Sequence, residues 1–338
     1  MMSNFRSALL KWSSAKASTA RNPDDDIYKR RPKENVRDYL FRVGLSKSFP
    51  EFKKKRPDEF QESLYNGAFP KRDHILHSIV NKLKDNPGHE ESLLSLTEMV
   101  LDSYSGLVCH TNAAGDTVLH RMAELGQGIL VRAIHGHFER LENGPEVLLE
   151  AIGKTNNEGK TCLHIAIDKL GNGGDLSLLN TLIDLADSQT LGIAEKSLNH
   201  TVLHCLVDYK SCQIDKKMCE VENCQDCEIA SYVTPRDFMQ TLRKLVQKNP
   251  SVLKVLDVEG RCPYQYHLAT VEKKKPTITS SENNESITPN HQSPEKVDSQ
   301  DLLELVEDYL CECFLSLESF DDICHILLGK SMTPLHLS

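Results

Sequence analysis

The sequence lacks any run of 18 apolar residues, so we expect no transmembrane segment. It also lacks the apolar core of a signal peptide near its N-terminus. Without a secretory signal, the odd total of 11 cysteines is typical of reduced thiols rather than of a disulfide framework. These absences together predict an intracellular protein, either cytoplasmic or nuclear.

Motifs that carry common enzyme chemistry are missing as well. The chain contains no glycine-rich phosphate loop, no nucleophile elbow and no His-Glu-x-x-His zinc motif. We therefore expect a protein without enzymatic activity.

Charge is distributed unevenly along the chain. Residues 1–70 carry 15 Lys and Arg against 9 Asp and Glu, a net charge of +6, whereas the whole chain carries −9. Residues 71–338 therefore carry −15. An acidic surface repels the phosphate backbone, so we expect no nucleic-acid partner for this part.

A four-residue phrase recurs along the acidic part. It reads Thr-Val-Leu-His at 117–120, Thr-Cys-Leu-His at 161–164 and Thr-Val-Leu-His at 201–204, with histidines 44 and 40 residues apart. Weaker copies end at His77 and His336, and a further copy has Gln265 at the His position. Recurrence at such a period indicates a solenoid of stacked units.

Each part of the phrase has a physical role. Thr suits the N-cap of a helix, and the Pro that follows the cap position at 263 and 334 suits the first helical residue. Polar turns with Asn and Gly precede the phrase at 112–116, 156–160 and 257–261, where a tight hairpin needs positive backbone dihedrals. Because the His recurs with the scaffold, we interpret it as a structural residue that bonds backbone between units.

A second helix follows each short one. Apolar residues recur at helical spacing over 93–100, 129–134, 178–185 and 238–246. Each pair of helices is too small to bury its own core, so neighbouring units must stack.

The phrase and the preceding turn resemble the ankyrin repeat, best at 159–166 and well at 115–126. The resemblance implies an all-α solenoid of helix–turn–helix units with short β-hairpin loops, and a surface of hairpin tips and short-helix faces that binds other proteins. The period departs from the usual ~33 residues, so insertions must lie between helices or before a hairpin.

The order of segments follows from these patterns. We expect a disordered basic tail at 1–33, an N-terminal capping region at 34–70, divergent repeats over 71–270, a disordered insert at 271–300, a helical pair at 301–331, and the start of a further repeat at 332–338. The repeats divide at about 71–109, 110–153, 154–195, 196–256 and 257–270. The incomplete last repeat favours a fragment of a longer protein. The composition of 1–23 also fits a mitochondrial transit peptide, and the basic run at 29–33 fits a nuclear import signal.

The leading functional hypothesis is a monomeric, non-enzymatic scaffold or adaptor. By the resemblance, the partner-binding residues lie at the loop tips and on the short helices: Asn112, Asp116, Arg121, Glu124, Asn156, Asn157, Glu158, Lys160, Asp168, Lys169, Asn199, Glu259 and Arg261. Their mostly acidic character predicts a protein partner with basic or polar patches. The alternative is the N-terminal regulatory region of a larger enzyme or channel.

A cysteine-rich insert gives a third hypothesis. Cys224 and Cys227 have the C-x-x-C spacing that holds one zinc ion, and Cys212 and Cys219 complete a four-thiolate set. A structural zinc would help to fold a polar insert, whereas the alternative is a loop with free thiols. No other cofactor is expected.

Overall fold

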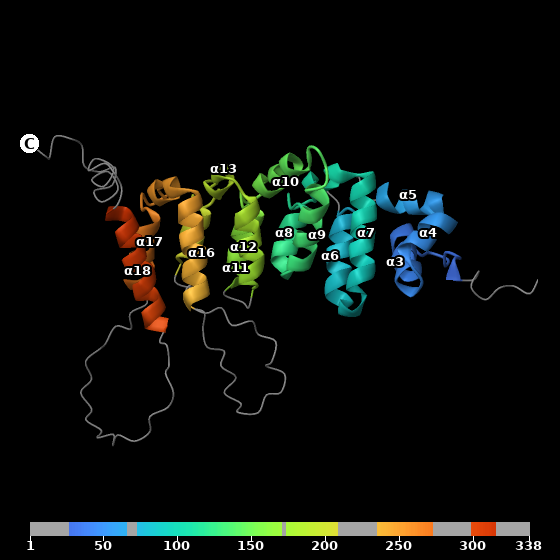
Figure 1. Ribbon diagram of the computed structural model, residues 1–338, viewed down its shortest axis with the longest axis horizontal. Helices are drawn as coiled ribbons and strands as arrows, with labels where there is room; N and C mark the ends of the chain where they lie inside the picture. The colour runs from blue at the N-terminus through green and yellow to red at the C-terminus, as the bar shows by residue number, and fades with distance from the viewer. Residues whose placement is uncertain (1–26, 66–72, 171–173, 209–234, 273–298, 316–338) are drawn as a thin grey trace, which may run out of the picture.

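The computed structural model describes residues 27–65, 73–170, 174–208, 235–272 and 299–315. These ranges are largely helical, which confirms the predicted all-α class. The helices stand side by side in a row, with α3 near one end and α18 at the other (Figure 1). The predicted β-hairpins do not form strands in the described ranges. One isolated bridge, between Ala194 and Thr201, is the β-type pairing there.

Pairs of helices repeat along the row. The first helices are α6 (Ile75–Asp85), α8 (Val118–Leu125), α11 (Cys162–Leu170), α14 (Val202–Leu206) and α17 (Pro263–Glu272). The second helices are α7 (Glu90–Ser103), α9 (Gly128–Phe138), α12 (Leu176–Leu185), α16 (Pro235–Lys248) and α18 (Ser299–Leu315). Each first helix packs on the next first helix, and each second helix on the next second helix.

Short helical elements account for much of the long period. They are η2 (Ser105–Cys109), α10 (Gly144–Gly153), α13 (Ser188–Leu191) and η4 (Pro250–Lys254), while η1 (Pro87–His89) joins α6 to α7. Each of the first four follows a second helix and precedes a loop. The extra residues were predicted between helices or before a hairpin, and in the described units these four elements lie before the loop.

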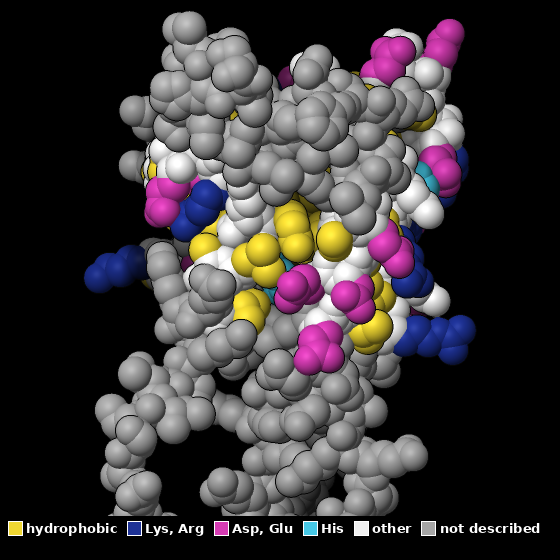
Figure 2. All heavy atoms as spheres, turned by 90° about the vertical axis from the view of Figure 1, so that its left-hand side faces the viewer, with side chains coloured by type: hydrophobic (Ala, Val, Ile, Leu, Met, Phe, Trp, Pro, Cys, Tyr) yellow, Lys and Arg dark blue, Asp and Glu magenta, His cyan; other side chains and the backbone are white. Residues whose placement is uncertain are grey.

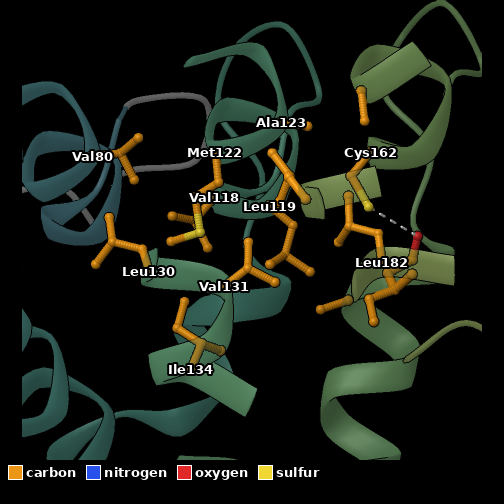
Figure 3. Close-up of a cluster of buried hydrophobic side chains, with 14 of the residues drawn as sticks. Val80, Val118, Leu119, Met122, Ala123, Leu130, Val131, Ile134, Cys162 and Leu182 are labelled. Atoms are coloured by element: carbon orange, nitrogen blue, oxygen red, sulfur yellow. Dashed lines mark hydrogen bonds between the residues drawn. The ribbon is translucent and has the colours of Figure 1, made fainter. Parts of the chain in front are cut away.

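The core runs between the two layers of helices. Val118, Leu119 and Met122 of α8 point toward Leu130 and Val131 of α9 (Figure 3). All five side chains are at most 1 % exposed. Burial of one such side chain stabilises the fold by roughly 1.5–3 kcal/mol, and the cluster continues into neighbouring units. The stability of each unit therefore depends on its neighbours.

A separate helical module covers the first unit. It consists of α3 (Val36–Ser46), α4 (Phe49–Lys55) and α5 (Pro57–Tyr65). Its core is aromatic, with the rings of Tyr39 and Phe52 packed edge to face at 5.0 Å. The helices α3 and α4 contact α7, and α5 contacts α6.

The start of the described chain lies on this module. The Arg42 guanidinium donates to the carbonyls of Ile27 and Lys29 and pairs with Glu34 at 2.7 Å. Arg42 thereby holds the basic run at 29–33 against α3. Residues 273–298 of the insert predicted at 271–300 lie outside the described residues, whereas 271–272 belong to α17 and 299–300 to α18. The zinc cysteines, the second helix of the 301–331 pair and the repeat start at 332–338 also lie outside the described residues.

Candidate functional site

The loops before α8, α11, α14 and α17 are built in a similar way. In the loop before α11, the side-chain oxygen of Asn156 accepts hydrogen bonds from the backbone N–H groups of Glu158 and Lys160 at 3.0 and 3.1 Å. Asn112 and Asp257 make the same pair of bonds in their own loops. The loop before α14 uses the Glu195 carboxylate instead, which accepts from the N–H groups two and three residues ahead. Each loop is thus fixed by one side chain.

Neighbouring loops are joined by backbone hydrogen bonds. The N–H of Asn157 donates to the Ala114 carbonyl at 3.0 Å, and the N–H of Lys196 donates to the Glu158 carbonyl at 3.0 Å. In the same way, the N–H of Val258 in the loop before α17 donates to the Leu198 carbonyl in the loop before α14. The loop tips therefore form one continuous edge along the row of helices.

Three asparagines that we predicted at a partner interface hold this edge together. The amide of Asn156 donates to Asp116 at 3.0 Å, that of Asn157 to the Ala113 carbonyl at 3.0 Å, and that of Asn199 to the Leu256 carbonyl at 2.7 Å. A fourth, Asn112, donates to Asp73 across the preceding loop. These amides are therefore engaged within the protein.

Glycine is required where loops approach closely. Gly159 has φ +81°, and a Cβ there would lie 2.8 Å from the Lys196 backbone nitrogen, whereas Gly260 has φ +77° and open space around it. We expect Gly260→Ala to lower the free energy of unfolding by about 1–2 kcal/mol, from the left-handed backbone alone. Gly159→Ala should cost roughly 3 kcal/mol, because it also displaces the neighbouring loop. Urea denaturation of both variants measures the difference, and equal losses would contradict the role assigned to loop contact.

The recurrent histidines link one unit to the next. In α11, Nδ1 of His164 accepts from the backbone N–H of Thr161 at 3.2 Å and lies 2.9 Å from its hydroxyl. Its Nε2 lies 3.1 Å from the His200 carbonyl of the next unit. A carbonyl only accepts, so Nε2 carries the proton. Equivalent links join three other units: His77 to Asp116, His120 to Lys160, and His204 to Arg261.

Glutamine takes over this role in α17. The side-chain oxygen of Gln265 accepts from the backbone N–H of Cys262 at 3.0 Å, as the His ring nitrogen does elsewhere. The replacement of His by Gln therefore preserves the hydrogen bond at the start of the helix.

Burial keeps the recurrent histidines and the buried cysteines uncharged. It lowers the pKa of His164 and of His204 to about 4, and both ring nitrogens of each are hydrogen-bonded within the fold. Burial also raises the pKa of Cys109 to about 11 and of Cys162 to about 12, so these thiols stay protonated. A protonated thiol is a poor nucleophile. These residues therefore serve the scaffold.

A pocket of about 240 Å³ lies between α8, α11 and the two loops in front of them. His120 and Ile165 line it together with six of the residues predicted for partner binding: Asp116, Glu124, Asn156, Glu158, Asp168 and Lys169. Ile165 was not predicted from the sequence as a lining residue. It directly follows the recurrent His, as Arg121 does in α8, so the register of the first helices could have revealed it.

Ion pairs surround the pocket. Lys160 lies 2.7 Å from Asp168 and 3.6 Å from Glu158, and Arg121 pairs with Glu124. Glu158 is 69 % and Asp168 43 % exposed at the side chain, so these pairs are worth little to stability and remain accessible to a ligand.

Two more of the predicted residues, Glu259 and Arg261, lie at the loop before α17. Arg261 forms a pair with Asp257 at 2.8 Å and stacks over the Tyr266 ring at 5.1 Å, and Glu259 pairs with Arg261 at 2.7 Å. The structure thus places Glu259 and Arg261 together, apart from the residues that line the pocket.

Within the described ranges, no three His, Cys, Asp or Glu side chains are grouped to hold a metal ion. The proposed ligands Cys212, Cys219, Cys224 and Cys227 lie outside those ranges. No described helix combines the length and the apolar composition needed to cross a bilayer. A scan against protein-family models finds no matching family, and a search of curated proteins finds no matching sequence.

Proposed function

We propose that this chain is a non-enzymatic interaction module of the ankyrin-repeat type, which acts as a scaffold or adaptor. Its support is the repeated unit of capped first helix, second helix and projecting loop, with loops and first helices aligned along one side. The longer period is consistent with the proposal, because short helical elements are added before the loops. They leave the stacking of first helices unchanged.

The pocket between α8 and α11 is the proposed recognition site. One observation carries this: six residues chosen from the sequence for partner binding line the same pocket. Four of these are carboxylates, and an isoleucine lies with them, so we assign the pocket to an Arg or Lys side chain of a partner protein. The aliphatic part of such a side chain would lie on Ile165 while its charge meets the carboxylates.

The test is a charge reversal that spares the fold. In the variant Glu158→Lys/Asp168→Lys, the two exposed carboxylates of the pocket become cations, while the loop bonds of Asn156 stay. The matched control is Glu142→Lys/Glu146→Lys, which makes the same charge change at exposed residues around the start of α10. Partners captured by the wild-type protein are purified, and the affinity of each variant is measured by calorimetry.

We expect the pocket variant to bind at least about tenfold more weakly, and the control to bind as the wild type does. Wild-type affinity should also fall with added salt, because the exposed charges are screened. If the pocket variant keeps its affinity for every partner, the pocket is not the recognition site.

A further inference from the structure

Two apolar residues of each repeat are fully buried in four successive units. They are the Leu of the recurrent phrase, or its equivalent, and the residue four positions after it. The first position is at most 1 % exposed in Leu76, Leu119, Leu163 and Leu203, and the second is at most 2 % exposed in Val80, Ala123, Ile167 and Val207. In α17 the corresponding residues are Tyr264 and Leu268, and both are half-buried. The four covered pairs each have a following first helix, whereas α17 has none within the described residues.

The end of the row therefore presents apolar side chains. Leu305 of α18 is 46 % exposed, and Tyr264 lies beside Cys311 and Glu307 of the same helix. Figure 2 faces this end and shows apolar side chains with acidic ones beside them. Glu304, Asp308 and Glu312 of α18 are exposed. A second copy placed face to face would bring these like charges together, which disfavours a symmetric dimer here.

The chain repeats its phrase at a suitable distance from this face. From the last residue of a second helix to the next cap position, the chain advances 14 residues (103 to 117), 23 (138 to 161), 16 (185 to 201) and 14 (248 to 262). From Leu315, the last described residue of α18, to Thr333 it advances 18 residues (315 to 333), within the same range. The segment from 332 to 338 carries no charged Lys, Arg, Asp or Glu side chain.

We propose that this end face is the docking surface for residues 332–338 of the same chain, which start the first helix of a sixth unit. Thr333 caps that helix, Pro334 takes its first position, and Leu335 covers Tyr264. By the register of the other units, the amide of Gln265 donates to the carbonyl before the cap, that of Met332. A single helical turn is marginal in water, so its stability comes from packing on α17. The inference is independent of the pocket between α8 and α11.

Two native thiols report on the docking. Cys311 lies beside Tyr264 at the end face, whereas Cys313 lies beside Tyr309, whose ring stacks under Arg243 of α16. The 338-residue chain is pulsed with N-ethylmaleimide, and labelling at each cysteine is measured by peptide mass spectrometry. We expect Leu335→Asp to raise the labelling rate of Cys311 about tenfold, which corresponds to a loss of about 1.4 kcal/mol in the free energy of docking. The labelling rate of Cys313 should not change. The matched control Ser338→Asp should leave both rates unchanged.

Three outcomes would overturn the inference. Equal Cys311 rates in the wild type, in Leu335→Asp and in a chain ending at residue 331 would show that the segment does not cover the face. A parallel rise at Cys313 would show loosening of α18 rather than uncovering of its end. A twofold mass by light scattering, with Cys311 protection that disappears on dilution, would make a second copy the occupant.

Discussion

Replacing His164 by alanine is expected to lower the free energy of unfolding by about 3 kcal/mol. The substitution removes a fully buried ring and leaves the backbone N–H of Thr161 and the carbonyl of His200 without their partner. It therefore damages the cap of α11 and its link to the following unit at once. Urea denaturation followed by far-ultraviolet circular dichroism measures the loss.

The matched variant is His164→Gln. Gln265 shows that glutamine can accept from the cap N–H in the same fold, so His164→Gln should cost less than about 1 kcal/mol. If both variants lose the same free energy, packing of the imidazole ring decides stability at this position and the hydrogen bonds do not. A gap of about 2 kcal/mol between them identifies the two hydrogen bonds as the main contribution.

The recurrent phrase and the apolar stripes were together sufficient to predict the helix pairs. Thr117, Thr161 and Thr201 each immediately precede a first helix. The apolar stripes coincide with the second helices in the structure. Both signals are local, since a cap needs neighbouring residues and a stripe needs a few turns of helix. Elements with such signals can be located from one sequence.

The short helices before the loops could not be predicted in this way. α10 begins at Gly144-Pro145, which is an ordinary turn signal, and α13 has four residues, too few for a periodic pattern. These elements are stabilised by contacts with other parts of the unit, such as α10 against η2. Their presence depends on tertiary packing, which a local pattern does not contain.

Sequence position and side-chain direction differ in how far they can be predicted for the candidate site. The sequence identified loop residues, but it did not give the direction of each side chain. Asn156 and Asn157 have both donors and acceptors, and the structure uses their amides between loops, whereas Glu158 and Asp168 stay exposed because they carry charge. Position in a loop thus predicts proximity to a surface, while the side-chain chemistry decides whether the residue faces solvent.

Acidification is expected to destabilise the protein well above the pH at which carboxylates titrate. An unfolded His titrates near pH 6.5, whereas burial lowers the pKa of His164 and His204 to about 4 in the fold. Between these values the unfolded chain binds more protons, so stability is complete above pH 6.5 and is lost as the pH falls toward 4. At pH 5, each of these two histidines lowers the free energy of unfolding by about 2 kcal/mol relative to its value at neutral pH.

The paired carboxylate of Glu34 affects stability at a lower pH than the buried histidines do. The Arg42 guanidinium lowers the pKa of Glu34 to about 2, so the stability that this pair provides is present above pH 4.5 and is lost between 4.5 and 2. Unfolding free energies between pH 7.5 and 5 therefore report the histidines. At pH 5, His164→Gln should retain about 2 kcal/mol more of its own pH 7.5 stability than the wild type does, because one buried titrating group has been removed. Parallel pH profiles for the two proteins would show that His164 is already charged in the fold, and its link to the His200 carbonyl would then have to persist in the imidazolium form.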